Sequence, residues 1–270
     1  MMITKTPCIT YLACIVASVT ICFTSAQAAT IITVNNVVTE FGGNNLGTTT
    51  FSNYTVNSAI NSPLLVVAVA IEENSVSVSN VSFGGSNLTK ATDISASTEG
   101  YVTLYYLANP TVDSAAAITV TSGGTDTMGI SAFTLSNVNQ LNPLGNTDAF
   151  SNINNDGGLA LDPTTSITSV DSDSLLISAL MSGGGSTDYA VTSPGMSFVN
   201  EGGGNGGVHM DIGSWEGGAL GNTTSLGFTG STGTRVAIVS AEFIAIPEPS
   251  SLILMAVGLF AGVVLIRRRR

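Results

Sequence analysis

Few side chains in this sequence are suited to acid–base, nucleophilic or metal chemistry. His209 is the only histidine, and no Cys-x-x-Cys or His-x-x-x-His spacing occurs, so no histidine or cysteine metal site is predicted. A Ser-His-Asp triad would have to use His209, and no Gly-x-Ser-x-Gly turn is present to hold its serine. We predict that His209 is a surface residue in a glycine-rich loop. Gly202 to Gly207 match Gly-x-Gly-x-x-Gly but lack the flanking strand and helix of a dinucleotide site.

Carboxylates and aromatic rings are the better candidates for chemistry. Glycoside hydrolysis needs two carboxylates about 5–10 Å apart, and the sequence concentrates acids near an aromatic residue only around Asp211, Trp215 and Glu216. A secreted glycoside hydrolase is therefore a distant alternative, and we expect no enzyme. Tyr101 and Tyr105 share the less core-like face of an expected strand, and Trp215 is expected in a loop. These three are the candidate carbohydrate contacts, with core or rim packing as the alternative.

One oxygen-rich segment resembles the first half of a calcium loop. Asn152, Asn154 and Asp156 alternate before Gly157, as oxygen ligands do before the turning glycine of such loops. The first ligand is Asn rather than Asp, and Pro163 stands where a bidentate Glu would close the site. The segment therefore predicts either a calcium site or a polar surface turn, and no other cofactor is expected.

Strands must position these candidates. The chain is rich in Thr, Ser, Asn, Gly, Val and Ile and poor in Lys, Arg and Glu, which favours strands and turns over helices. The predicted class is all-β, an antiparallel β-sandwich or jelly roll. Leu64–Ile71 is a continuous apolar run typical of a central strand buried on both faces. Further strands are expected at 76–83 with a bulge near Asn80 and a hairpin turn at Gly84-Gly85, and at 101–107, 117–121, 129–135, 174–181 and 235–244.

The polar and glycine-rich stretches 139–163 and 183–222 are expected to be long loops or weakly specified strand pairs. No internal repeat and no second hydrophobic core is evident, so a single domain is predicted at 29–245. Segments within 64–146, namely Val81–Thr89, Tyr105–Pro110 and Ile118–Val120, look like a β-sandwich module common in bacterial exported proteins. This resemblance implies a fold and no particular ligand.

The charge of this body is strongly acidic. Between Ala29 and Ile246 only Lys90 and Arg235 are basic against 17 acidic residues, a net charge of −15. Nucleic acids and anionic membrane surfaces both need basic footprints, so neither is an expected partner. The acids are scattered, which indicates solubility, with cation binding in a matrix as the alternative.

The N-terminus reads as a secretory signal peptide at 1–28. Lys5 precedes the apolar stretch Ile9–Phe23, and Ala26 and Ala28 supply the two small residues that signal peptidase reads. We therefore expect the Sec machinery and signal peptidase as partners and cleavage after Ala28. All three cysteines lie within this segment, so the mature protein is expected to have no disulfide.

The C-terminus reads as a membrane segment. Ser250–Ile266 is an uncharged run of 17 residues, at the short limit for a helix that crosses about 30 Å of hydrocarbon. Arg267, Arg268, Arg269 and Arg270 follow directly. Because basic flanks stay cytoplasmic, we expect the domain outside the inner membrane and the C-terminus inside.

Pro247-Glu248-Pro249, the apolar run and the arginine cluster resemble the PEP-CTERM sorting signal of Gram-negative bacteria. The resemblance covers 246–270. It implies an exosortase as partner, a membrane-embedded cysteine protease or transpeptidase that cuts near the motif and releases or re-attaches the domain. It further implies a surface or extracellular protein in bacteria that make exopolysaccharide and biofilm. The expected function is a structural or interaction role there, and a carbohydrate-binding or adhesive module is the first alternative.

Overall fold

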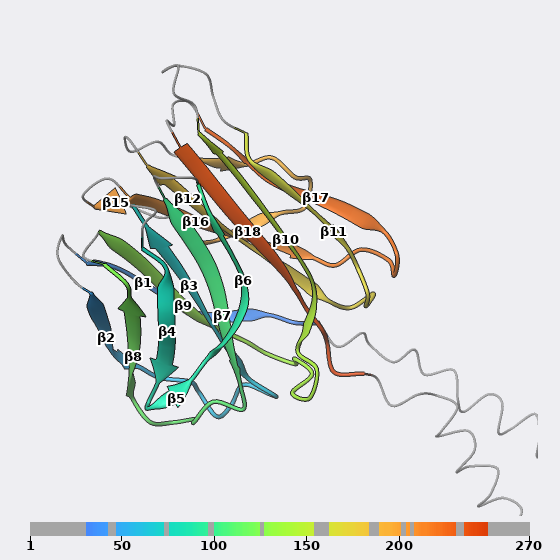
Figure 1. Ribbon diagram of the computed structural model, residues 1–270. Coiled ribbons are helices and arrows are strands. Elements are labelled where there is room, and N and C mark those ends of the chain that lie inside the picture. Colours follow the sequence, from blue (N-terminus) through green and yellow to red (C-terminus); the bar gives the residue numbers. More distant parts are fainter. Residues whose placement is uncertain are drawn as a thin grey trace, which may run out of the picture. The chain divides into compact units, whose positions relative to one another are not determined.

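The described part of the chain is built from antiparallel strands alone. The computed structural model describes residues 31–42, 47–72, 76–96, 100–124, 127–153, 162–183, 189–200, 204–205, 208–230 and 235–247. Within them, every regular element is a β-strand (Figure 1), and residues 31–246 form one compact unit. The prediction of an all-β antiparallel fold is confirmed.

The first part of the chain forms two sheets. The five-stranded sheet has the order β1-β9-β3-β7-β6, and the four-stranded sheet has the order β2-β8-β4-β5. The strands of the first sheet are β1 (Val34–Gly42), β9 (Met128–Leu135), β3 (Leu64–Ile71), β7 (Tyr101–Ala108) and β6 (Thr89–Ser95). Those of the second are β2 (Thr48–Tyr54), β8 (Ala116–Ser122), β4 (Val78–Phe83) and β5 (Ser86–Asn87).

The second part of the chain forms two further sheets. One has the order β10-β18-β12-β16-β14, with β15 also on β16, and the other has the order β11-β17-β13. The strands of the larger sheet are β10 (Leu144–Ile153), β18 (Arg235–Phe243), β12 (Leu175–Gly183), β16 (Val208–Glu216), β14 (Ser197–Asn200) and β15 (Gly204–Asn205). Those of the smaller are β11 (Thr164–Thr168), β17 (Thr223–Thr229) and β13 (Ala190–Val191).

The two parts repeat one topology. The order β1-β9-β3-β7-β6 becomes β10-β18-β12-β16-β14 when each strand is replaced by its counterpart, and β2-β8-β4 becomes β11-β17-β13. Each order is that of a jelly roll, two sheets joined through Greek-key connections. We call β1–β9 the first repeat and β10–β18 the second repeat. The expectation that the chain lacks an internal repeat is wrong, because the repetition lies in strand order and is weak in the sequence.

Hydrophobic side chains fill three spaces between the four sheets. The central cluster joins the five-stranded sheet of the first repeat to the larger sheet of the second, through residues such as Val66, Phe133, Ile177 and Phe243. A second cluster lies inside the first repeat and a third inside the second repeat. The expectation of a single core is therefore wrong. The sheets stack as four layers, with the two large sheets in the middle.

This stacking explains the apolar runs of the two central strands. Every residue of Leu64–Ile71 is buried, with alternate residues in the central cluster and in the cluster of the first repeat. Leu175–Gly183 is also buried throughout, and it divides its side chains between the central cluster and that of the second repeat. A strand between two hydrophobic layers cannot alternate apolar with polar residues. The prediction of two-sided burial for Leu64–Ile71 is confirmed.

The local features predicted around β4 are confirmed. Its register with β8 shifts between Val78 and Asn80, which is the expected bulge. Gly84 and Gly85 have φ of 55° and 85° and connect Phe83 to its partner Ser86. Two residues with positive φ suit the tight turn of a hairpin, and glycine adopts this backbone without strain.

The two stretches that were expected to be long loops or weakly specified strand pairs contain strands. Residues 139–163 contain the edge strand β10, and residues 183–222 contain β13, β14, β15 and β16. Beyond the described residues lie the signal peptide with Ala26 and Ala28, the remainder of the sorting motif with Glu248 and Pro249, the apolar run and Arg267–Arg270. Among the residues that are described, no helix is long and apolar enough to cross a membrane.

The central cluster leads to a prediction about cooperativity. Phe243 is fully buried there and meets the Tyr106 ring of the other repeat edge-on at 6.4 Å between ring centroids. Phe243→Ala should lower the free energy of unfolding by about 3–5 kcal/mol. The wild-type protein should unfold in one transition, measured by urea denaturation of the detergent-solubilised chain. Phe150→Ala, at a 38% exposed position of β10, is the control and should change stability by less than about 1 kcal/mol. Separate unfolding of the two repeats would contradict the shared core.

Candidate functional site

Tyr101 and Tyr105 are core residues of the first repeat. Only 2% of Tyr101 and 5% of Tyr105 is exposed, and both lie in the cluster between the two sheets of that repeat. Of the two alternatives for this face of β7, a sugar contact and core packing, the structure shows core packing. The four-stranded sheet of the first repeat covers it, and the other face of β7 is covered by the second repeat.

The hydroxyl groups of these tyrosines are occupied. The Tyr101 hydroxyl donates to Asp93 Oδ2 at 2.8 Å, and Lys90 Nζ donates to the same oxygen at 2.8 Å. Burial opposes ionisation of Asp93, but these two donors outweigh it and hold the pKa of the carboxyl below its usual range. Burial, with Asp93 beside it, raises the pKa of Tyr101. This cluster stabilises β6 against β7.

His209 and Asp211 form a buried pair on β16. Their exposed fractions are 4% and 0%, and His209 Nε2 lies 2.9 Å from Asp211 Oδ2. The expectation that His209 lies on the surface in a loop is wrong. Gly202–Gly207 precedes the strand β16, and the smaller sheet of the second repeat covers the face of β16 that carries His209. Ser182 is the cross-strand partner of His209 and is also buried. These three residue types resemble a triad, yet none of the three is exposed to a substrate, so we assign the pair a structural role.

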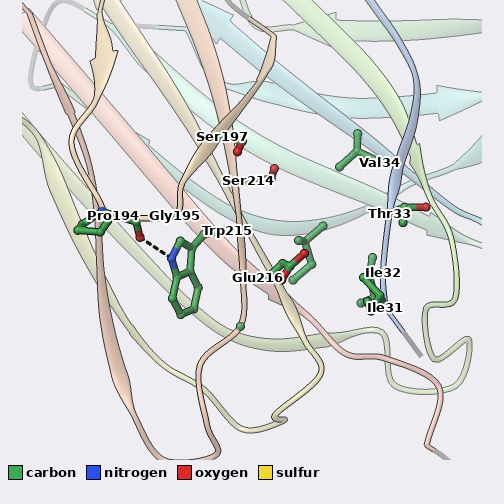
Figure 2. A pocket seen from close by; sticks show the side chains of 12 residues that line it. Ile31, Ile32, Thr33, Val34, Pro194, Gly195, Ser197, Ser214, Trp215 and Glu216 are labelled. Carbon is green, nitrogen blue, oxygen red and sulfur yellow. Dashed lines mark hydrogen bonds between the residues drawn. The ribbon is translucent and has the colours of Figure 1, made fainter. Parts of the chain in front are cut away.

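An open groove lies where β1 of the first repeat approaches β14 and β16 of the second (Figure 2). Its volume is about 670 Å³. One wall is the start of the first repeat, Ile31–Val34, and the other is formed by Pro194–Ser197 and Ser214–Gly217. Trp215 belongs to β16 and not to a loop as expected, and it is half-buried. The groove combines apolar walls with the polar side chains of serine, threonine and Glu216.

Trp215 is held at the border of this groove by a specific bond. Its indole Nε1 donates to the Pro194 carbonyl at 2.9 Å (Figure 2). The turn after Pro194 depends on Gly195, which has φ of +83° and whose missing Cβ would stand 3.1 Å from the indole nitrogen. The ring is half-buried and packs against the cluster inside the second repeat, so only part of its carbon surface is exposed at the groove. Glu216 is exposed and is the only carboxylate among the described residues that line the groove.

The two repeats differ in side-chain size at one position beside the groove. Leu64 of β3 pairs with Ala108, and its counterpart Leu175 of β12 pairs with Glu216, so Tyr106 and Ser214 occupy equivalent positions two residues earlier. Tyr106 packs its ring against Phe243 across the central cluster. Ser214 leaves that volume open, and its cross-strand partner Ser197 is also small. The first repeat thus has a large aromatic ring at the position where the second repeat has a small side chain.

The calcium segment is described only in part. Asn152 is exposed near the end of β10, opposite Val236 of β18, while Asn154 and Asp156 lie outside the described residues. No cluster of three or more acidic, histidine or cysteine ligands occurs among the residues that the structure describes. Calcium binding therefore stays a prediction.

The groove residues that the sequence analysis missed are Ile31–Val34, Pro194, Gly195, Ser197 and Ser214. They come from distant parts of the chain, and none has an unusual local pattern. A comparison of the two repeats, in which Ser214 is equivalent to Tyr106, is the one signal that could have indicated this region.

The described part of the chain is an all-β body of two jelly-roll repeats with a groove between them, and comparisons identify the tail. Residues 245–270 match the PEP-CTERM protein-sorting motif. The chain is therefore an exosortase substrate, an exported protein whose precursor is anchored in the membrane through its C-terminal region.

Other comparisons add little. No curated protein matches the chain. Three chains among solved structures match. One of these, titled "Cucumber Leaf Spot Virus", is 12% identical, covers 80% of this chain and 97% of its own, and has a TM-score of 0.21. A likeness this low carries no argument about function.

The Asp93 cluster gives a pH-dependent prediction. Because the folded pKa of Asp93 is lowered, its contribution to stability is present above the unfolded pKa of about 3.9 and is lost as pH falls through the folded value. Tyr101→Phe removes one donor and should destabilise the protein by about 1 kcal/mol at pH 7, with a smaller difference in acid. The measurement is urea denaturation at several pH values. Tyr105→Phe is the control, because its hydroxyl donates to the neutral Val78 carbonyl at 3.2 Å. An equal pH profile in the two variants would refute this account.

Proposed function

We propose that the exported domain is a non-enzymatic surface or matrix protein that associates with extracellular polysaccharide. The sorting motif supports the export and processing steps. The observation that carries the binding role is the groove between the repeats, with an oriented indole at its border and hydroxyl groups and one carboxylate along its walls. Aromatic carbon surface beside polar groups is suited to a sugar ring, which presents both C–H faces and hydroxyls.

Charge narrows the class of ligand. The body carries a net charge of −15, so a polyanionic glycan would be repelled at low salt. A neutral or amino-bearing polysaccharide avoids this repulsion, and Glu216 could accept hydrogen bonds from its hydroxyl or ammonium groups. The hydrolase alternative is less well supported, because hydrolysis needs a second carboxylate across the sugar and the described groove holds only Glu216.

The binding role predicts a specific loss in a pull-down assay. Trp215→Ala should weaken binding of the protein to exopolysaccharide from its own host by about tenfold, which corresponds to about 1.4 kcal/mol. Phe150→Ala, which removes an exposed aromatic ring on β10, is the matched control and should bind as the wild type does. Equal binding by both variants would exclude the groove. Turnover of the glycan that Glu216→Gln abolishes would instead support the hydrolase.

Processing gives a separate prediction. Glu248→Ala should leave full-length precursor in the inner-membrane fraction, because the motif that the exosortase reads has lost its charge. Immunoblots of membrane and extracellular fractions measure the two forms. Glu216→Ala removes a carboxylate from the folded domain and should be processed normally. Normal release of the Glu248→Ala protein would show that the motif does not direct processing.

A further inference from the structure

The fold ends directly before the sorting motif. β18 ends at Phe243, and the amide of Ile246 still donates to the Asn137 carbonyl at 3.0 Å. Pro247, the first residue of the motif, is exposed. At a maximum of about 3.6 Å per residue, the three motif residues span no more than about 11 Å. A protease that binds this motif must therefore come close to the folded domain.

Four large apolar side chains are exposed on the segments around this exit. The exposed fractions are 54% for Ile31, 90% for Leu141, 48% for Val170 and 68% for Leu220. We call these four residues the exit surface. Isolated exposed apolar residues are ordinary on a soluble domain, but these four belong to segments that hydrogen bonds tie to the end of β18, and such a set indicates an interaction site.

Hydrogen bonds connect Ile31 and Leu141 to the exit. Asn137 binds Ile246 through its carbonyl, and its side-chain amide donates to the Ile31 carbonyl at 2.8 Å. The Leu141 loop lies between two backbone bonds to Ile244, one from the Asn139 amide at 2.9 Å and one to the Pro143 carbonyl at 3.0 Å. Hydrogen bonds thus connect Ile31 through Asn137 to Ile246, and the Leu141 loop to Ile244.

Glu242 connects the remaining two segments. Its carboxylate is fully buried and accepts hydrogen bonds from the Val170 amide at 2.9 Å and the Ser174 hydroxyl at 2.8 Å. The Gly221 amide, next to Leu220, donates to the Ser169 carbonyl at 2.8 Å. A buried carboxylate with several donors holds its neighbours in place, because each bond that breaks removes a donor that water cannot replace. The exit surface is therefore presented on a fixed frame.

Charge favours a protein over a lipid bilayer as the partner of this surface. Asp171, Asp173 and Glu216 lie on the same loops or beside them, and Arg235, one of the two basic residues of the body, is at the opposite end of β18. An anionic bilayer would be repelled by these carboxylates. A protein surface that is apolar with a neutral or basic rim would not be.

We propose that the exit surface is a second recognition site for the membrane-embedded protease that processes the sorting motif. The proposal rests on the processing step of the proposed function. The motif supplies the residues that are cut, and Ile31, Leu141, Val170 and Leu220 dock the folded domain on the face that the protease exposes outside the membrane. Docking raises the local concentration of the motif at the protease without any change in the motif itself.

The test is a pulse-chase measurement of processing in a host that carries the exosortase. In the full-length chain, Leu141→Ser with Leu220→Ser should slow conversion of precursor to mature protein by about tenfold, the effect of losing about 1.4 kcal/mol of contact. Val37→Ser with Phe150→Ser is the matched control, since these exposed apolar residues lie on the edge strands β1 and β10. The control should be processed at the wild-type rate. Melting curves check that both proteins are folded.

Several outcomes would overturn the proposal. One is a wild-type rate in the folded double variant. If the double variant does not fold, Leu141→Ser alone decides, because that side chain is 90% exposed. A Glu248→Ala protein that is still processed would undermine the proposed function itself, which separates the two failures. The single tryptophan, Trp215, reports on the membrane alternative: quenching by brominated lipids that the double variant abolishes would assign the surface to the bilayer instead.

Discussion

The arrangement of the whole body depends on burying the two central strands on both faces. Every residue of Leu64–Ile71 and of Leu175–Gly183 is buried, so each strand must have a covering layer on both faces. One layer comes from the small sheet of its own repeat, and the other comes from the opposite repeat. Neither repeat can therefore satisfy its central strand alone.

The sequence predicts what local patterns determine. A continuous apolar run identifies β3, and paired glycines identify the turn after β4, because both signals depend on neighbouring residues. The strands β10 and β16 were not predicted, because apolar and polar residues are mixed along them. In β16, Val208, Met210 and Ile212 enter the central cluster, while His209 and Asp211 lie on the opposite face and satisfy each other. The glycines before β16 are also typical of a loop. Whether a polar residue is buried depends on its partners, which local sequence does not identify.

The candidate site shows the same limit. The alternation of residues along β7 does not tell whether the face with Tyr101 and Tyr105 is exposed, because the sheet that covers this face comes from other parts of the chain. The groove needs Ile31–Val34 to meet Ser214, a contact that exists only once the repeats have docked. The sorting motif is different, since Pro247, Glu248 and Pro249 are read as a linear sequence by another protein and need no fold of their own. That is why the tail could be recognised and the groove could not.

Joining the two repeats in one chain removes a constraint that a dimer of identical subunits cannot escape. In a symmetric dimer every substitution appears twice, so a change that opens one mouth of the interface opens the other as well and weakens the shared core doubly. Here the first repeat keeps Tyr106 packed against Phe243, and the second repeat has Ser214 at the equivalent position. The fused protein can therefore specialise one side for a ligand while the other side continues to hold the halves together.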